Sequence, residues 1–183
     1  LLRATEGGHL HIFKALVMRG ADPSASTYTQ NTALLLACGR GHTAMAQGLI
    51  EGGADLEAIN NQGFSPLLMA CQYAHVSLAL ELLRRGARVN VATSRGFTPL
   101  MLAGQHGLLD LAKALLDGGA DLNAAQETGD TPLSLAAHFG HPELVQELVL
   151  RGADTGTKDK EGVSPGEDYD AGVDVPTQRK IQV

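Results

Sequence analysis

Residues 93–125 read TSRGFTPLMLAGQHGLLDLAKALLDGGADLNAA, and this segment predicts two short helices, each followed by a turn. Thr98 has the hydroxyl of an N-cap residue, and Pro99 then takes the first helical position, where its missing N–H is not needed. The first helix should end near Gly107, because glycine commonly ends helices. A second should follow, since the apolar residues from Leu108 onward recur every three or four positions. Helices of about ten residues span only about 15 Å, so neighbours must cover their apolar face.

The same pattern returns every 33 residues along the chain. One series consists of the Gly-Ala-Asp tripeptides and one Gly-Ala-Arg variant, which begin at Gly20, Gly53, Gly86, Gly119 and Gly152. A second consists of Thr-Pro-Leu and its variants, which begin at Thr32, Ser65, Thr98, Thr131 and Ser164. A third places histidine or leucine at His9, His42, His75, Leu108 and His141. Three series that keep one period without an insertion predict an array of stacked repeats.

The period and the Thr-Pro-Leu, Gly-His and Gly-Ala-Asp motifs closely resemble those of the ankyrin-repeat family, over residues 1 to about 165. This resemblance implies an all-α solenoid of stacked antiparallel helix pairs with protruding β-turns or hairpins. In the family's register, the ankyrin-repeat domain 1–165 has a partial unit, four full units and the start of a degenerate cap, at 1–26, 27–59, 60–92, 93–125, 126–158 and 159–165. Some positions depart from the family pattern. Ala33 replaces the proline, and the usual histidine is replaced by Leu35, Leu68, Met101 and Ser134.

The two ends of the chain differ from the full repeats. Leu1 matches the leucine of a Thr-Pro-Leu whose first two residues are missing, so we expect a piece of a longer chain. Residues 166–183 lose the register and combine acidic side chains with Arg179 and Lys180, which predicts an irregular tail. A solvated cap is one interpretation of this tail, and a peptide that docks on this or another protein is the alternative.

The composition argues against several classes of function. The 183 residues include 14 Lys and Arg and 20 Asp and Glu, and the formal charge of −6 argues against binding to nucleic acid or an anionic membrane. No run approaches the roughly 18 apolar residues of a membrane-spanning helix, so we expect no direct membrane insertion. Cys38 and Cys71 are one period apart, which places their Cα atoms beyond the limit of about 7 Å for a disulfide. Reduced core thiols agree with an intracellular location, in the cytoplasm or nucleus.

Two candidate motifs for chemistry have simpler explanations. Residues 162–166 have the Gly-x-Ser-x-Gly pattern of a hydrolase nucleophile, but no buried strand precedes them and Ser164 falls on the repeating N-cap position. Four histidines share one repeat position: His9, His42, His75 and His141. Stacked helices lie about 8–10 Å apart, whereas zinc–nitrogen bonds measure about 2 Å, so no two of these histidines can share an ion. The sequence therefore predicts no enzyme, no metal site and no cofactor.

In ankyrin-like arrays the partner usually binds the concave side, formed by the turn tips and the exposed edge of each first helix. The resemblance therefore implies a binding groove whose large side chains are Tyr28, Arg40, Phe64, Tyr73, Arg95, Phe97, His106, His138 and Phe139. The set contains five of the seven aromatic residues, and exposed rings and arginines are typical anchors of protein interfaces. The alternative is that the phenylalanine of each Gly-Phe-Thr/Ser-Pro-Leu segment simply packs against the neighbouring turn.

The predicted function is a non-catalytic protein–protein interaction module, a scaffold or adaptor that acts as a monomer. Its partner should be a protein or peptide with apolar anchors and an acidic element near Arg40 and Arg95. The alternative is a regulatory or targeting segment of a larger enzyme or channel, and the fold alone does not select between the two.

Two turn asparagines are candidates for modification. In the family, similar asparagines can be hydroxylated by an oxygen-dependent asparaginyl hydroxylase, and Leu115, Asp121 and Asn123 have the spacing that this resembles. Asn90 is the weaker candidate, because Arg88 stands where the acid is expected. Structural hydrogen bonding within the turn is the alternative role.

Overall fold

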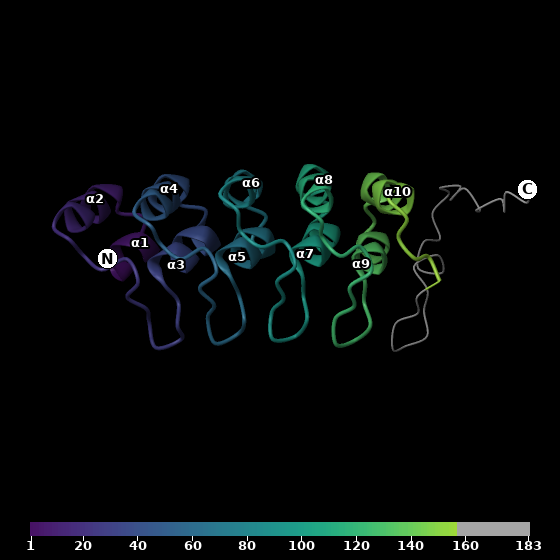
Figure 1. The fold of residues 1–183 in the computed structure, drawn as a ribbon, viewed down its shortest axis with the longest axis horizontal. Coiled ribbons are helices and arrows are strands. Elements are labelled where there is room, and N and C mark those ends of the chain that lie inside the picture. Colours follow the sequence, from purple (N-terminus) through teal and green to yellow (C-terminus); the bar gives the residue numbers. More distant parts are fainter. Residues whose placement is uncertain (157–183) are drawn as a thin grey trace, which may run out of the picture.

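The computed structural model describes residues 1–156, which contain five antiparallel pairs of α-helices joined by loops. Figure 1 shows the odd-numbered helices in an inner row, the even-numbered helices in an outer row, and a loop that projects between successive pairs. The helices are α1 (Leu2–Glu6), α2 (Leu10–Met18), α3 (Ala33–Arg40), α4 (Thr43–Glu51), α5 (Pro66–Gln72), α6 (Val76–Arg84), α7 (Pro99–His106), α8 (Leu109–Asp117), α9 (Pro132–His138) and α10 (Pro142–Leu150). This arrangement is the all-α solenoid that the repeat predicts.

Each inner helix from α3 onward begins at a hydroxyl cap. The side-chain oxygen of Thr32 accepts a hydrogen bond from the N–H of Leu35 at 3.3 Å, and the same bond recurs at the starts of α5, α7 and α9. It satisfies one of the backbone N–H groups that a helix leaves free at its N-terminus. Because α3 keeps this bond without the proline that begins α5, α7 and α9, the replacement by Ala33 leaves the cap intact.

Histidines at the start of the outer helices connect neighbouring units. Nε2 of His75 lies 3.4 Å from the carbonyl oxygen of Gly39, and Nε2 of His141 lies 3.1 Å from that of Gln105. The rings also cover a glycine of the preceding unit, since a Cβ atom added to Gly41 would lie 2.6 Å from Cε1 of His75. These contacts support a structural role for the repeated histidine.

A continuous apolar core lies between the two rows of helices. Leucines that recur at one position of the inner helices and one of the outer helices are at most 2 % exposed: Leu34, Leu67, Leu100, Leu133, Leu49, Leu82, Leu115 and Leu148. Cys38 and Cys71 are also buried, and both are free. Burial raises the pKa of the Cys71 thiol to about 12 and raises the pKa of Cys38 as well. Both cysteines thus lie in the core as predicted, and their reduced state stays a prediction.

The loops between helix pairs are hairpins that hydrogen-bond to one another. In chain order we call 27–32, 60–65, 93–98 and 126–131 the first to fourth hairpins. The Asn61 N–H donates to the Thr29 oxygen at 3.2 Å, and equivalent bonds of 2.9 and 3.3 Å join the second hairpin to the third and the third to the fourth. These bonds hold the hairpins in a row beside the inner helices.

Candidate functional site

The hairpins and the C-terminal ends of the inner helices form one surface, which we call the groove face. Four of the nine residues predicted to line it lie on hairpins, namely Tyr28, Phe64, Arg95 and Phe97. The other five lie at the ends of α3, α5, α7 and α9, namely Arg40, Tyr73, His106, His138 and Phe139. Three of the nine, Phe64, Arg95 and Phe97, line a common hollow.

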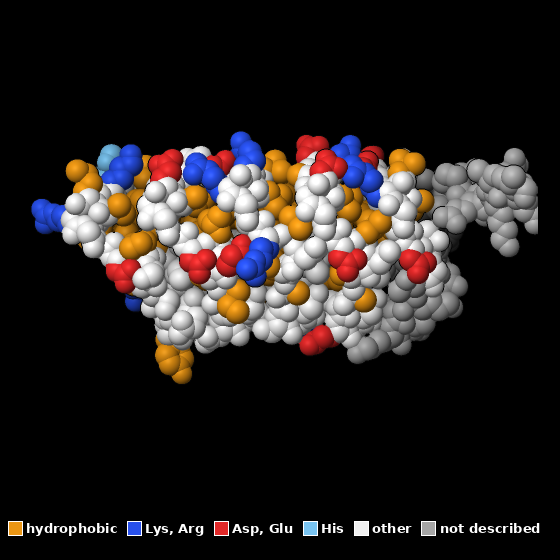
Figure 2. Space-filling view, in the orientation of Figure 1, with side chains coloured by type: hydrophobic (Ala, Val, Ile, Leu, Met, Phe, Trp, Pro, Cys, Tyr) orange, Lys and Arg blue, Asp and Glu red, His pale blue; other side chains and the backbone are white. Residues whose placement is uncertain are grey.

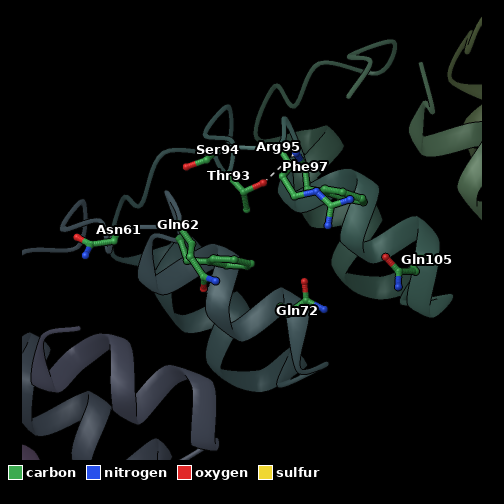
Figure 3. Close-up of a pocket in the computed structure, with 9 residues that line it drawn as sticks. Asn61, Gln62, Gln72, Thr93, Ser94, Arg95, Phe97 and Gln105 are labelled. Carbon is green, nitrogen blue, oxygen red and sulfur yellow. Dashed lines mark hydrogen bonds between the residues drawn. The ribbon is translucent and has the colours of Figure 1, made fainter. Parts of the chain in front are cut away.

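This hollow, of about 470 Å³, lies where the second and third hairpins meet α5 and α7, and we call it the Arg95 pocket (Figure 3). Its lining residues are Asn61, Gln62, Phe64, Gln72, Thr93, Ser94, Arg95, Phe97 and Gln105. In Figure 3, Gln72 and Gln105 come from the two helices, while Arg95 and Phe97 come from the hairpin that precedes α7. The two glutamines are not among the nine predicted groove residues, because they are neither rings nor large cationic side chains. Gln72 and Gln105 are 33 residues apart and so occupy the same repeat position, which is the signal by which the sequence could have indicated them.

Arg95 carries a positive charge that no carboxylate within residues 1–156 neutralises. Its side chain is exposed, and its Cζ atom lies 6.0 Å from the centre of the Phe97 ring, within the range of a cation–π contact. Arg40, by contrast, lies 3.3 Å from a carboxylate oxygen of Glu6 in the preceding unit. Such an exposed ion pair is weak. Of the two arginines predicted to contact an acidic partner, Arg95 is nevertheless the more available, because Arg40 already has a carboxylate beside it.

The rings of Phe64 and Phe97 are half-buried and pack against the apolar core. Their hairpins are closed by side chains, since the Phe64 N–H donates to Oδ1 of Asn60 at 3.0 Å and the Phe97 N–H donates to Oγ1 of Thr93 at 3.1 Å. The two rings therefore stabilise the hairpins and also form part of the pocket wall. The alternative prediction, that these phenylalanines simply pack against neighbouring structure, therefore holds for the buried side of each ring.

Three other predicted rings are exposed. Tyr28 is 97 % exposed at the first hairpin, Tyr73 is 56 % exposed beyond α5, and Phe139 is 48 % exposed beyond α9. Tyr73 stacks on His75 with ring centres 6.4 Å apart, and Phe139 meets the edge of His138 at 5.1 Å. These rings are spread along the groove face and do not line the Arg95 pocket.

His106, at the end of α7, combines partial exposure with a buried ring nitrogen. Its Nε2 atom has no hydrogen-bond partner among residues 1–156. The structure thus places His106 at the groove face without assigning it a contact there.

The candidate asparagines connect the turns of successive units. The Asn90 side chain donates to the Gly119 oxygen at 2.9 Å and accepts from the Asp121 N–H at 2.8 Å, and the Asn123 side chain accepts from the Asp154 N–H at 2.9 Å. Both asparagines are exposed and have the structural role that was the alternative. Hydroxylation of Asn123 stays a prediction, and the intact mass of protein isolated from its own cells would show the added oxygen atom.

The motifs for catalysis and metal binding receive no support in the described part of the chain. Residues 1–156 contain no group of three His, Cys, Asp or Glu side chains placed to hold a metal ion. The Gly-x-Ser-x-Gly motif with Ser164 and the predicted tail 166–183 lie outside the described residues. None of α1 to α10 is both long and apolar enough to cross a membrane.

A second hollow, of about 770 Å³, lies on the outer row between α6 and α8. Figure 2 shows apolar side chains in the furrows between the outer helices, and the apolar walls of this hollow include Leu80, Leu83, Val89 and Ala114. Its two charged side chains are already paired, Arg84 with Glu81 at 3.0 Å and Asp117 with Arg151 at 2.9 Å. The outer hollow therefore lacks the free polar side chains that the Arg95 pocket offers to a ligand.

Comparison with known proteins agrees with the helix pairs and hairpins described above. The family model described as Ankyrin repeats (3 copies) matches residues 1–93 and, in a second match, residues 77–159. A search of curated proteins found no match. Because the two family matches together cover most of the chain, including every helix and hairpin of the groove face, the protein belongs to the ankyrin-repeat family.

Proposed function

We propose that this chain is a non-catalytic module that binds a partner protein or peptide on its groove face. Ankyrin repeats are generally protein–protein interaction modules. The observation that carries the proposal is the combination, on one face, of exposed rings at Tyr73 and Phe139 with the guanidinium of Arg95, which pairs with no carboxylate of residues 1–156. Rigid aromatic side chains bury a large area at low entropic cost, which makes them effective anchors in an interface.

The setting of the module is also part of the proposal. The free, buried state of Cys38 and Cys71 supports an intracellular location. We propose that the module acts as a monomer, which leaves the groove face free for its partner.

Capture of partners from cells of origin, with variants of the groove face, tests this function. Tyr73→Ala with Phe139→Ala is the better variant, because both rings are about half exposed and their removal should leave the core intact. The matched control is Ile12→Ala with Met18→Ala, which removes two exposed apolar side chains from the outer helix α2.

We expect the groove variant to lose captured proteins that the control variant and the unchanged chain retain. Circular dichroism should show that all three unfold at the same temperature. Equal capture by the groove variant, or loss only in the α2 control, would show that partners bind elsewhere.

A further inference from the structure

In the Arg95 pocket, no carboxylate from residues 1–156 pairs with the Arg95 guanidinium, and the chain is acidic overall. The whole chain carries a formal charge of −6, so long-range attraction would not favour an acidic ligand. Any preference for an acid must then come from direct contact with the Arg95 guanidinium. A guanidinium offers several N–H donors in a planar fork that matches a carboxylate.

The position of neighbouring acids indicates where the ligand's carboxylate would lie. Glu127 is exposed on the fourth hairpin, and its N–H donates to the Arg95 oxygen. Its charge disfavours an acid on the α9 side of Arg95. The pocket side, towards α5, has amide and hydroxyl side chains and no carboxylate in its lining. We therefore place the acid of the ligand over the pocket.

Four carboxamide side chains of the pocket make no hydrogen bond within residues 1–156: Asn61, Gln62, Gln72 and Gln105. Other side-chain amides of the chain are bonded, such as that of Asn60, which donates to Oδ1 of Asn31 at 2.9 Å. A carboxamide both donates and accepts, so it matches the N–H and C=O groups of a peptide backbone. A helical ligand bonds those groups internally, whereas an extended ligand leaves them free. Free amides therefore favour an extended segment.

The rings of Phe64 and Phe97 add an apolar element one repeat apart. Both rings line the pocket together with the amides and Arg95, and Figure 3 shows Phe97 beside Arg95. An aliphatic or aromatic side chain of the ligand would cover them. Figure 1 shows inner helices α3 and α9 on either side of α5 and α7, so the groove face extends beyond these two helices in both directions and has room for a longer segment. This favours an internal acidic residue over a terminal carboxylate.

We propose that the Arg95 pocket binds an extended peptide segment in which an Asp or Glu side chain contacts Arg95 and an adjacent apolar side chain packs on Phe64 and Phe97. The free carboxamides bond the backbone of that segment. This inference rests on the proposed function and names the chemistry of the partner.

Selection of random linear peptides displayed on phage, with the full chain as target, tests the inference. Selected peptides should contain an acid next to an apolar residue. Arg95→Glu should weaken their binding about tenfold, because attraction becomes repulsion. Changing the peptide's acid to Lys should restore binding to the Arg95→Glu variant. The matched control is Arg19→Glu, which makes the same charge change at an exposed arginine after α2, and it should leave affinity unchanged.

Two further measurements separate the contributions of the pocket. Raising the salt from about 0.01 M to about 0.15 M, which shortens the screening length from about 30 to about 8 Å, should weaken binding to the unchanged chain more than to Arg95→Gln. The Gln105 carboxamide is proposed to bond the backbone of the peptide, so its effect should not depend on the peptide's charge. Gln105→Leu should therefore weaken binding by the same factor in two pairs: acidic peptides with the unchanged Arg95, and Lys-containing peptides with Arg95→Glu.

The outcomes distinguish this inference from the function on which it rests. Peptides that lose affinity with Tyr73→Ala and Phe139→Ala but show no acidic preference and no response to Arg95→Glu would overturn the inference and leave the groove as the binding site. Peptides that ignore every groove variant would overturn both. Selected peptides that bind only through a free C-terminus, or only when phosphorylated, would also overturn the inference, as would a selection that yields no binding peptide.

Discussion

At the scale of single residues, the replacement of a repeated glycine by Ala74 accompanies the replacement of a repeated histidine by Leu108 in the next unit. The last residue before the histidine position has a left-handed backbone, with φ of 69° at Gly41 and 56° at Ala74. His75 lies in the unit after Gly41, and its ring occupies the space that a Cβ atom on residue 41 would need. At the equivalent place after Ala74 the chain has Leu108 instead of histidine. Residue 74 is therefore able to carry a Cβ atom, because no histidine ring from the next unit occupies the space beside it.

Substitution at Gly41 should reveal this coupling. Gly53→Ala meets no atom of residues 1–156 within 4 Å and has φ of 81°, so it measures backbone strain alone, about 1 kcal/mol. Gly41→Ala has similar strain and also meets His75, so it should cost about 1–3 kcal/mol more. His75→Leu added to Gly41→Ala should recover part of that loss. Urea unfolding of the single and double variants measures the coupling, and strictly additive losses would contradict the contact.

The two buried thiols should make stability depend on pH in alkaline solution. An unfolded thiol ionises near pH 8.5, whereas burial raises the pKa of Cys71 to about 12 and raises that of Cys38. The folded chain therefore holds protons that the unfolded chain releases. The stability linked to this difference is complete below about pH 8.5 and falls as pH rises from there towards the folded pKa values, by up to about 1.4 kcal/mol per pH unit for each thiol.

Cys38→Ala with Cys71→Ala removes both groups and should flatten this decline. Urea unfolding under reducing conditions, compared between about pH 8 and about pH 10, measures the difference between the two proteins. All other side chains are the same in the two proteins, so the comparison isolates the two thiols. Parallel pH profiles would mean that the thiols are not protected by burial.

At the scale of elements, the turns after the outer helices are joined by side chains at one repeat position. Glu57, Asn90 and Asn123 each accept a hydrogen bond from a backbone N–H of the next unit, at 3.0, 2.8 and 2.9 Å. Glu57 serves in place of an asparagine, so the position requires an oxygen acceptor rather than a particular residue. This explains why the turns stay in register despite different sequences.

Asn90→Ala should cost about 1–2 kcal/mol, because it removes a donor and an acceptor between neighbouring turns. Asn61→Ala is the matched control, since its exposed amide makes no hydrogen bond within residues 1–156, and it should change the free energy of unfolding by less than about 0.5 kcal/mol. If urea unfolding showed the same loss of unfolding free energy for both variants, the hydrogen bonds of Asn90 would not stabilise the turns.

The elements could be predicted from the sequence because each depends on a local signal that recurs. Thr98 caps a helix through an N–H three residues on, and the signal lies within four residues of sequence. The grouping of groove residues depends instead on contacts between units. Arg40 meets Glu6, and the amides of Gln72 and Gln105 flank one pocket, only once the units are stacked. The sequence alone could not separate the half-buried Phe64 from more exposed rings for the same reason.

At the scale of the whole molecule, stability comes from each unit and from its interfaces with the neighbouring units. The inner helices have small residues at one repeat position, namely Cys38, Cys71, Gly104 and Ala137. Gly104 allows α9 to approach α7 closely, because a Cβ atom there would lie 2.7 Å from the backbone oxygen of Pro132 at the start of α9. The contact between α7 and α9 therefore has little room for added volume.

Gly104→Ala should weaken the connection between the last two helix pairs. The clash is with backbone, which cannot rotate away, so the variant should lose about 1–2 kcal/mol despite the higher helix propensity of alanine. Gly48→Ala in α4 is the matched control, since its nearest new contact is the Phe13 ring at 3.5 Å, and it should gain about 0.5–1 kcal/mol. Because neighbouring units stabilise each other only through their shared interface, the Gly104 variant should unfold over a wider range of urea, with faster hydrogen exchange in α9 and α10 than in α3 to α6. A single sharp transition at the original midpoint would show that the added methyl group is accommodated without weakening the interface between α7 and α9.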